Sequence, residues 1–187
     1  KYVLDYNIGV TTTDITGSKN PAGCFVGTTK IVTSKTVDLE LELQSNFKVG
    51  TSGSAKDAGL EAAFQALSTT RLNDVKCNKG FLRKDAVLSI IFLSDEEDQS
   101  LQTVAAYLKA YQAVKSGSQL PVVASALVGP SPSGCRGTNG SASRGARYLS
   151  IASSRRGVQQ SICNLTNALT NVVGASLVQS TSFKLLH

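Results

Sequence analysis

Apolar and polar positions in the first third of the chain predict short strands separated by loops. Residues 6–10 are mostly apolar and lead into a polar run at 11–14, which is typical of a strand that ends in a loop. Residues 16–29 form a long polar loop, and residues 30–33 allow a second short strand. Residues 37–43 alternate between apolar and acidic side chains, so we expect a half-exposed strand there.

Longer periodic and apolar runs in the rest of the chain predict helices between buried strands. Residues 86–93 are apolar almost throughout, as expected for a central parallel strand that is covered on both faces. A second buried strand is predicted at residues 121–128, and a short edge strand at 158–163. Apolar faces at helical spacing predict the helices, which are 56–67, 101–114, 146–153 and 165–178. Residues 129–143 are rich in Gly, Ser and Pro and are predicted to be a loop.

Strands that alternate with helices imply right-handed βαβ units. The predicted fold class is therefore α/β, with a doubly wound and mostly parallel sheet. No internal repeat or linker interrupts the pattern, and 187 residues fit one domain, so we expect a single domain over residues 1–187.

Composition and charge exclude several classes of protein. A hydrophobic fraction of 41% excludes an intrinsically disordered chain, and no apolar run is long enough for a membrane span. The net charge of +6 is scattered, and aromatic residues make up only 6%, so we expect no nucleic-acid partner. The sequence has no Met and starts at Lys1, so we expect it to be a processed or partial chain without a signal peptide of its own.

The cysteines predict disulfides rather than a metal site. They form no C-x-x-C pair, and the single His is the terminal His187, which disfavours zinc. An even number of well-separated cysteines fits disulfides in an oxidising compartment, although four buried thiols in a cytosolic protein remain an alternative. Four cysteines allow three pairings; we favour Cys135 with Cys163 and Cys24 with Cys77. The first of these pairs would join the loop at 129–143 to the element after the next helix.

Two polar segments are candidates for chemistry, because ligands of doubly wound sheets bind at the carboxyl ends of strands. They are the acidic turn at residues 94–98 and the hydroxyl-rich loop at residues 50–54. Carboxylate and hydroxyl oxygens together suit Mg²⁺ or Ca²⁺. The alternatives are that Ser94 or Asp95 simply caps the following helix, and that the loop is only a connection.

Enzyme motifs are missing from the sequence. The order G-x-x-x-x-G-K-[ST] of a phosphate loop is absent, and so is a G-x-S-x-G elbow. His187 stands alone at the tail, so a nucleophile has no plausible base. We therefore predict no enzyme activity, and a hydrolase that uses the acidic turn is the least favoured reading.

Several segments together carry a resemblance to a known family. Residues 5–14, 49–54 with 59–63, 80–83, 90–100, 145–149 and 161–163 resemble von Willebrand factor type A domains, in particular those of bacterial secreted or lipid-anchored surface proteins. The resemblance implies a Rossmann-like fold and a metal-ion-dependent adhesion site built from three loops. In this sequence Asp95 matches the third loop. Thr51 is the first choice for the second loop, with Ser52 and Ser54 as further hydroxyl candidates.

The resemblance also implies a function and an incomplete site. It implies an extracytoplasmic module (periplasmic, cell-surface or secreted) for adhesion or protein binding, with Mg²⁺, Ca²⁺ or Mn²⁺ held for a protein partner. The family's first loop, D-x-S-x-S, is absent, because the sequence starts just before the strand at 6–10. We expect the first central strand to come from another segment or another chain. The alternative is a structural subunit of a surface assembly with an incomplete, empty metal site and a strand supplied by another polypeptide.

Overall fold

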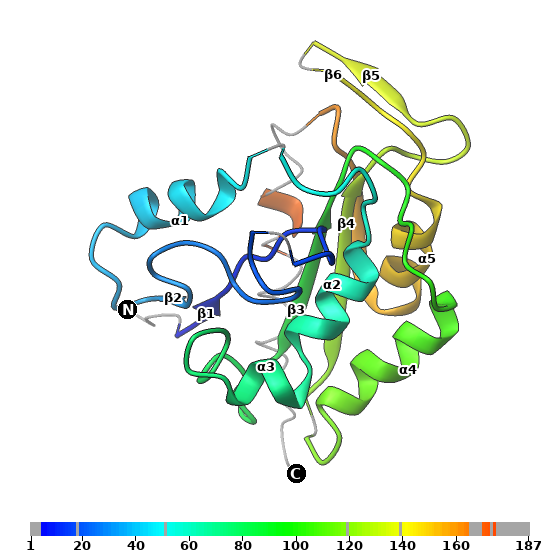
Figure 1. Ribbon diagram of the computed structural model, residues 1–187. Coiled ribbons are helices and arrows are strands. Elements are labelled where there is room, and N and C mark those ends of the chain that lie inside the picture. Colours follow the sequence, from blue (N-terminus) through cyan, green and yellow to red (C-terminus); the bar gives the residue numbers. More distant parts are fainter. Residues whose placement is uncertain are drawn as a thin grey trace. The chain divides into compact units, whose positions relative to one another are not determined.

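A computed structural model describes residues 5–17, 19–50, 52–118, 120–138, 140–164, 170–172 and 174, and it is mixed α/β (Figure 1). Its contacts divide the chain into two compact units. Unit 1 is Lys1–Lys84 with Gln99–Gln102, and unit 2 is Asp85–Asp98 with Thr103–His187. The expected single domain stays a prediction, and the two units are described separately.

The sheet of unit 2 is parallel, as predicted. It has the order β3-β4-β7, where β3 is Leu88–Leu93, β4 is Val122–Val128 and β7 is Arg156–Ser161. Strands β3 and β4 pair without interruption from Leu88 opposite Val122 to Leu93 opposite Leu127. These strands are the predicted ones at 86–93, 121–128 and 158–163, with slightly different ends.

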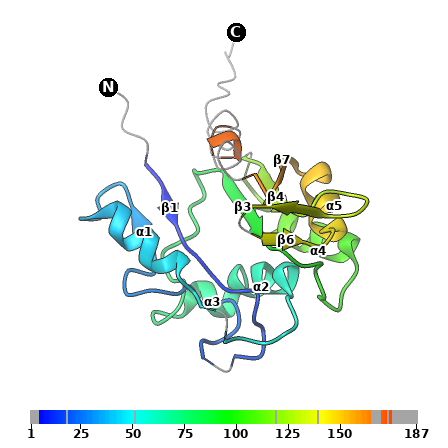
Figure 2. The same cartoon turned by 90° about the horizontal axis from the view of Figure 1, so that it is seen from above.

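Aromatic side chains join the sheet to two helices of unit 2. The helices are α4 (Val104–Val114) and α5 (Ala146–Ser154), which appear on the same side of the sheet in Figure 2. The ring of Phe92 lies 6.4 Å from that of Tyr111 on α4 and 5.2 Å from that of Tyr148 on α5. On the opposite face, Leu127 packs with Val172 and Val158. Unit 2 therefore has a sheet flanked by helices, the coarse architecture that the sequence predicts.

The central strand of this sheet is β4, which corrects the prediction for residues 86–93. Every residue of β4 is buried. Among the described strands β3 pairs only with β4, and its Ile91 and Leu93 are 44% and 48% exposed. An apolar run predicts a strand but does not say how many neighbours the strand has.

The pairing of β4 with β7 contains a register shift between Ala124 and Ala126. A Cβ at Gly157 would overlap the carbonyl oxygen of Ala124, so only glycine allows the two backbones to approach so closely there. The amide of Val158 donates to Oγ of Ser125 at 3.0 Å. The buried hydroxyl of Ser125 therefore supplies a partner for a β7 amide beside the irregularity.

Residues 129–143, predicted to be a loop, contain a small hairpin. Its strands are β5 (Cys135–Gly137) and β6 (Gly140–Ala142), which pair antiparallel. The disulfide between Cys135 and Cys163 ties this hairpin to the residues after β7. Its three-residue strands are too short to give a clear alternation of apolar and polar positions.

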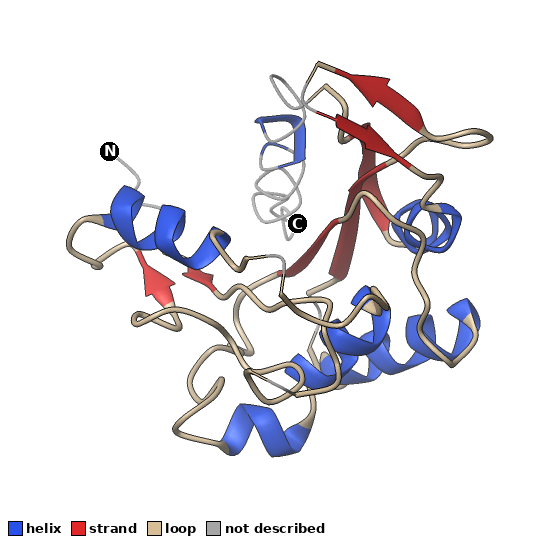
Figure 3. Ribbon diagram, turned by 45° about the horizontal axis from the view of Figure 1, so that its top comes forward, coloured by secondary structure: helices blue, strands red, loops and turns tan. Residues whose placement is uncertain are grey.

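Unit 1 contains much loop and short elements (Figure 3). Strands β1 (Asn7–Ile8) and β2 (Val32–Thr33) pair antiparallel. The helices are α1 (Leu39–Phe47), α2 (Gly59–Ala66) and α3 (Thr69–Asn73). Helix α2 lies within the predicted helix at 56–67, whereas α3 has only five residues and no prediction corresponds to it.

Helix α1 corrects the strand predicted at residues 37–43. The segment contains alternating Leu and Glu, which are good helix formers, and has no β-branched residue from 38 to 47. In the helix, Glu40 accepts a hydrogen bond from Nε2 of Gln44 at 3.1 Å, the contact expected one turn apart. Helix propensity therefore prevails over an alternation that is too short to decide between the two structures.

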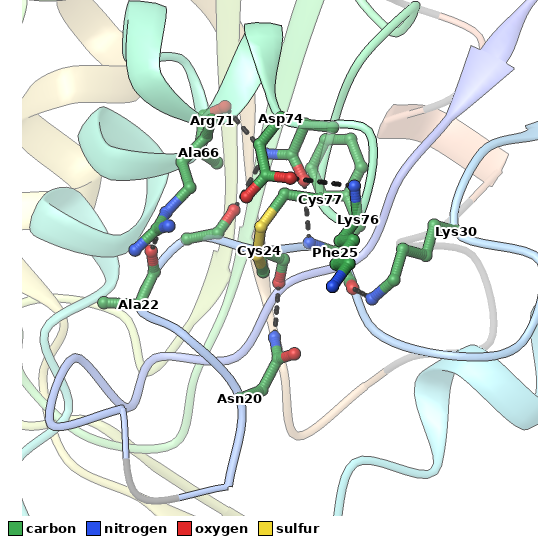
Figure 4. The surroundings of a disulfide bond; sticks show 12 residues. Asn20, Ala22, Cys24, Phe25, Lys30, Ala66, Arg71, Asp74, Lys76 and Cys77 are labelled. Carbon is green, nitrogen blue, oxygen red and sulfur yellow. Dashed lines mark hydrogen bonds between the residues drawn. A yellow bond between two sulfur atoms is a disulfide. The ribbon is translucent and has the colours of Figure 1, made fainter.

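A disulfide and a buried amide organise the centre of unit 1. Cys24 and Cys77 form the disulfide, and Figure 4 shows the polar contacts around it. The fully buried Asn78 accepts from the amide of Phe25 at 2.8 Å and donates to the carbonyls of Gly23 and Ala66 at 2.9 and 2.8 Å. One side chain thus joins the loop around residue 24 to the end of α2.

Candidate functional site

The acidic turn at 94–98 follows β3 directly and has a fixed backbone. Oγ of Ser94 accepts from the amide of Glu96 at 3.1 Å. The carbonyl of Asp95 accepts from the amide of Ser143 at 2.8 Å and from its hydroxyl at 3.1 Å. The turn is therefore connected to the segment that leads into α5.

Two of the four acids in this turn bind the start of α5. The carboxylate of Glu97 accepts from the amides of Ala146 and Arg147 at 2.9 and 3.1 Å. Asp98, whose side chain is fully buried, accepts from Nε of Arg147 at 2.8 Å. Both carboxylates lie at the amino end of a helix, where negative charge is favourable.

This arrangement corrects the capping alternative. Ser94 and Asp95 do not cap the helix that follows the turn, because α4 starts at Val104 and its cap is Thr103, whose side chain accepts from the amide of Ala106 at 3.2 Å. Glu97 does accept hydrogen bonds from the amino end of a helix, but this helix is α5, about fifty residues later in the sequence. Sequence spacing could not reveal this contact, because it depends on the fold.

Asp95 is the acid that is displayed. Its side chain is exposed, and its carboxylate has no hydrogen bond or ion pair to any described residue. Its backbone is held by Ser143 while its side chain stays available. Among the candidate ligands, Asp95 is therefore the one whose carboxylate is exposed and uncommitted while its main chain is fixed.

The hydroxyl-rich loop at 50–54 is less favourable for a cation. Thr51 lies outside the described residues. Oγ of Ser52 is hydrogen-bonded to Nζ of Lys19, and Oγ of Ser54 accepts from the amide of Lys56 at 3.1 Å. Ser52 and Ser54 belong to unit 1 and Asp95 to unit 2, so the common metal site expected from the sequence stays a prediction.

Two carboxylates that the sequence did not single out lie near this loop. Gly53 is so close to Asp14 that a Cβ on the glycine would be 3.3 Å from Oδ2 of the acid. Asp14 also accepts from the amide and hydroxyl of Thr16 at 2.8 and 2.6 Å. Asp57 accepts from the hydroxyl of Thr13 at 2.7 Å. The polar run at 11–14 is the available sequence signal for Asp14.

No group of three or more His, Cys, Asp or Glu side chains that could hold a metal ion occurs within the described ranges. His187 lies outside those ranges. All four cysteines are in disulfides, Cys24 with Cys77 and Cys135 with Cys163, with Cα–Cα distances of 4.8 and 6.1 Å. This is the pairing that we favoured from the sequence, and it is compatible with an oxidising compartment.

The chain matches no family model, no curated protein and no solved structure. In the part of the chain that the structure describes, no helix combines the length and apolar character needed to cross a membrane.

Proposed function

We propose that this chain is a von Willebrand factor type A-like binding module that acts outside the cytoplasm and adheres to a protein partner. The observation that carries the proposal is the state of Asp95: it follows a parallel strand at its carboxyl end, its main chain is fixed by Ser143, and its carboxylate is exposed and uncommitted. Ligand sites of parallel α/β sheets lie at this end of the strands. The disulfides favour an extracytoplasmic location.

A divalent cation, Mg²⁺ or alternatively Ca²⁺ or Mn²⁺, would be the link to the partner. Asp95 would hold the ion directly or through water. When bound, the ion would offer a coordination position to a carboxylate of the partner. The remaining oxygen ligands of the cation would have to come from other residues.

Calorimetric titration with MgCl₂ and MnCl₂ tests this proposal. We expect saturable binding to the wild type, loss of binding in Asp95→Ala and retention in Glu96→Ala, since Glu96 is the adjacent exposed acid. Circular dichroism spectra of both variants should match that of the wild type. No binding to the wild type, or equal loss in both variants, would refute the role of Asp95.

A second candidate is a structural subunit whose sheet is completed by a strand from another polypeptide. The observation in its favour is β3, which pairs only with β4 among the described strands and exposes Ile91 and Leu93. Such an edge with exposed apolar side chains invites strand addition. The hydrolase reading gains no support, because Glu97 and Asp98 are committed to α5.

For the second candidate, we take a second copy of this chain as the strand donor. Sedimentation velocity over a range of concentrations tests whether the chain associates with itself. We expect the wild type to self-associate and the double variant Ile91→Lys with Leu93→Lys to remain monomeric. Val75→Lys is the control, because Val75 is an exposed apolar residue of unit 1, outside the sheet. A wild type that stays monomeric at all concentrations rules out the second copy as donor.

A further inference from the structure

Unit 2 contains a cavity of about 740 Å³ at the end of the sheet opposite to Asp95. Its walls come from the last turn of α4 and the loop after it, the start of β4, and the junction between α5 and β7. In a parallel sheet the amino ends of the strands lie at this edge, whereas Asp95 follows the carboxyl end of β3. The volume is within the range of small-molecule sites.

The charged lining of this cavity is entirely positive. Lys109, Lys115, Arg155 and Arg156 line it, and none of its described lining residues is Asp or Glu. Two helix carboxyl ends contribute together about one negative charge, which is less than the four positive charges of the side chains. The field within the cavity therefore favours an anion.

Two of these cations also have structural contacts. Nζ of Lys115 donates to the carbonyl of Ala86 at 2.8 Å. A guanidinium nitrogen of Arg155 donates to the carbonyl of Leu108 at 2.6 Å, yet its Nε is buried and has no hydrogen-bond partner among the described residues. A buried donor without an acceptor is costly. Because Nε has no accessible surface, Arg155 would contact an oxyanion through other nitrogens of its guanidinium.

Arg156 contributes a charge from an unusual backbone position. Its φ is +56°, in the left-handed region that glycine adopts at lower cost. Its side chain is exposed and lines the cavity, as does that of Lys109. Strained backbone positions of this kind cluster at ligand sites, and Arg156 stands at such a position beside a positively charged cavity.

We propose that this cavity binds a small organic anion with several charged oxygens of carboxylate or phosphate type. Arg155, Arg156 and Lys109 would bind the oxygens, and Lys115 would add positive potential. The apolar start of β4, with Pro121, Val122 and Val123, would contact the uncharged part of the ligand. This site is independent of the cation site proposed at Asp95.

Calorimetric titrations with pyrophosphate and with citrate at low salt test the proposal on the full chain. We expect saturable, one-to-one binding of at least one of the two, and the preferred probe identifies the oxyanion as phosphate or carboxylate. The double variant Arg156→Gly with Lys109→Gln should bind about tenfold more weakly or worse. Its folding should be unimpaired, because glycine is the better residue at the positive φ of Arg156.

The control is the double variant Arg136→Ala with Lys76→Gln, which also loses two positive charges but from exposed positions outside the cavity. It should bind like the wild type. Absence of binding to the wild type, or the same loss in both double variants, would overturn the proposal, since the latter means attraction by net charge alone. If Arg156→Gly with Lys109→Gln fails to fold, the single variant Lys109→Gln replaces it, because Lys109 is exposed on α4. Weaker binding by this single variant supports the proposal, and binding equal to that of the wild type overturns it.

Discussion

Nε of Arg147 donates to the carboxylate of Asp98 at 2.8 Å, and the Asp98 side chain is fully buried while that of Arg147 is 28% exposed. The backbone amide of the same Arg147 also donates to Glu97. Two consecutive acids of the turn after β3 are therefore bound by one residue at the start of α5. The turn is an integral part of unit 2, and Asp95 is displayed on a fixed support.

The ion pair predicts different effects for neighbouring acids. Asp98→Asn should lower the free energy of unfolding by about 2 kcal/mol, because it removes the charge that a partly buried Arg147 requires. Asp95→Asn should change it by less than about 0.5 kcal/mol, because that carboxylate is exposed. Urea denaturation measures both values. Similar effects of the two substitutions would contradict the division of roles within the turn.

Glu97 should act as a remote cap of α5. Glu97→Ala leaves the amides of Ala146 and Arg147 without their acceptor and should cost about 1 kcal/mol of stability. Hydrogen exchange should show faster exchange at these amides, while exchange in the middle of α4 stays unchanged. Glu97→Gln, which keeps an acceptor oxygen, should recover part of the loss. Unchanged exchange in Glu97→Ala would be inconsistent with the cap.

Asn78 should be among the most sensitive positions of unit 1. Asn78→Ala leaves the amide of Phe25 and the carbonyls of Gly23 and Ala66 buried without their partner, which should cost about 3 kcal/mol. Asn73→Ala is the matched control, because Asn73 is exposed on α3. Thermal denaturation followed by circular dichroism compares the two. A tolerant Asn78 would mean that water replaces the amide in solution.

The two disulfides should differ in their accessibility to reductants. Cys24 and Cys77 are 1% and 4% exposed, whereas Cys135 and Cys163 are only partly buried. Mild reduction of the folded chain should therefore open the bond between Cys135 and Cys163 first, because thiolate attack requires access. Alkylation and mass spectrometry identify the released thiols. Release of Cys24 and Cys77 first would show that unit 1 opens more readily than unit 2.

Sequence patterns predicted several elements of unit 2 closely, whereas most of the helix expected at 165–178 lies outside the described residues. The expected helix at 146–153 is α5, Ala146–Ser154, and the expected strand at 121–128 is β4, Val122–Val128. These segments have strong periodicity or a continuous apolar run, and their local preference agrees with their final environment. The favoured cysteine pairing was also found. The bond between Cys135 and Cys163 joins a loop to a nearby element, whereas no local pattern indicated the bond between Cys24 and Cys77.

The remaining errors have identifiable physical causes. Residues 37–43 were predicted to be a strand because a short alternation of Leu and Glu resembles a half-exposed strand, yet the same residues are good helix formers. The sequence could not show which carboxylates of the acidic turn are hydrogen-bonded and which are exposed. The partners of Glu97, the amides of Ala146 and Arg147, come close to it only in the fold. The cations of the cavity come from separate segments, so no local pattern indicated them.

The bond between Cys135 and Cys163 has a consequence for resistance to proteases. The chain between these cysteines includes the exposed Arg136 and Arg144, both of which are trypsin cleavage sites. A cut after either residue leaves the two fragments covalently joined, so the protein would run at full size on a non-reducing gel. A cut in this segment therefore releases no fragment as long as the disulfide is intact.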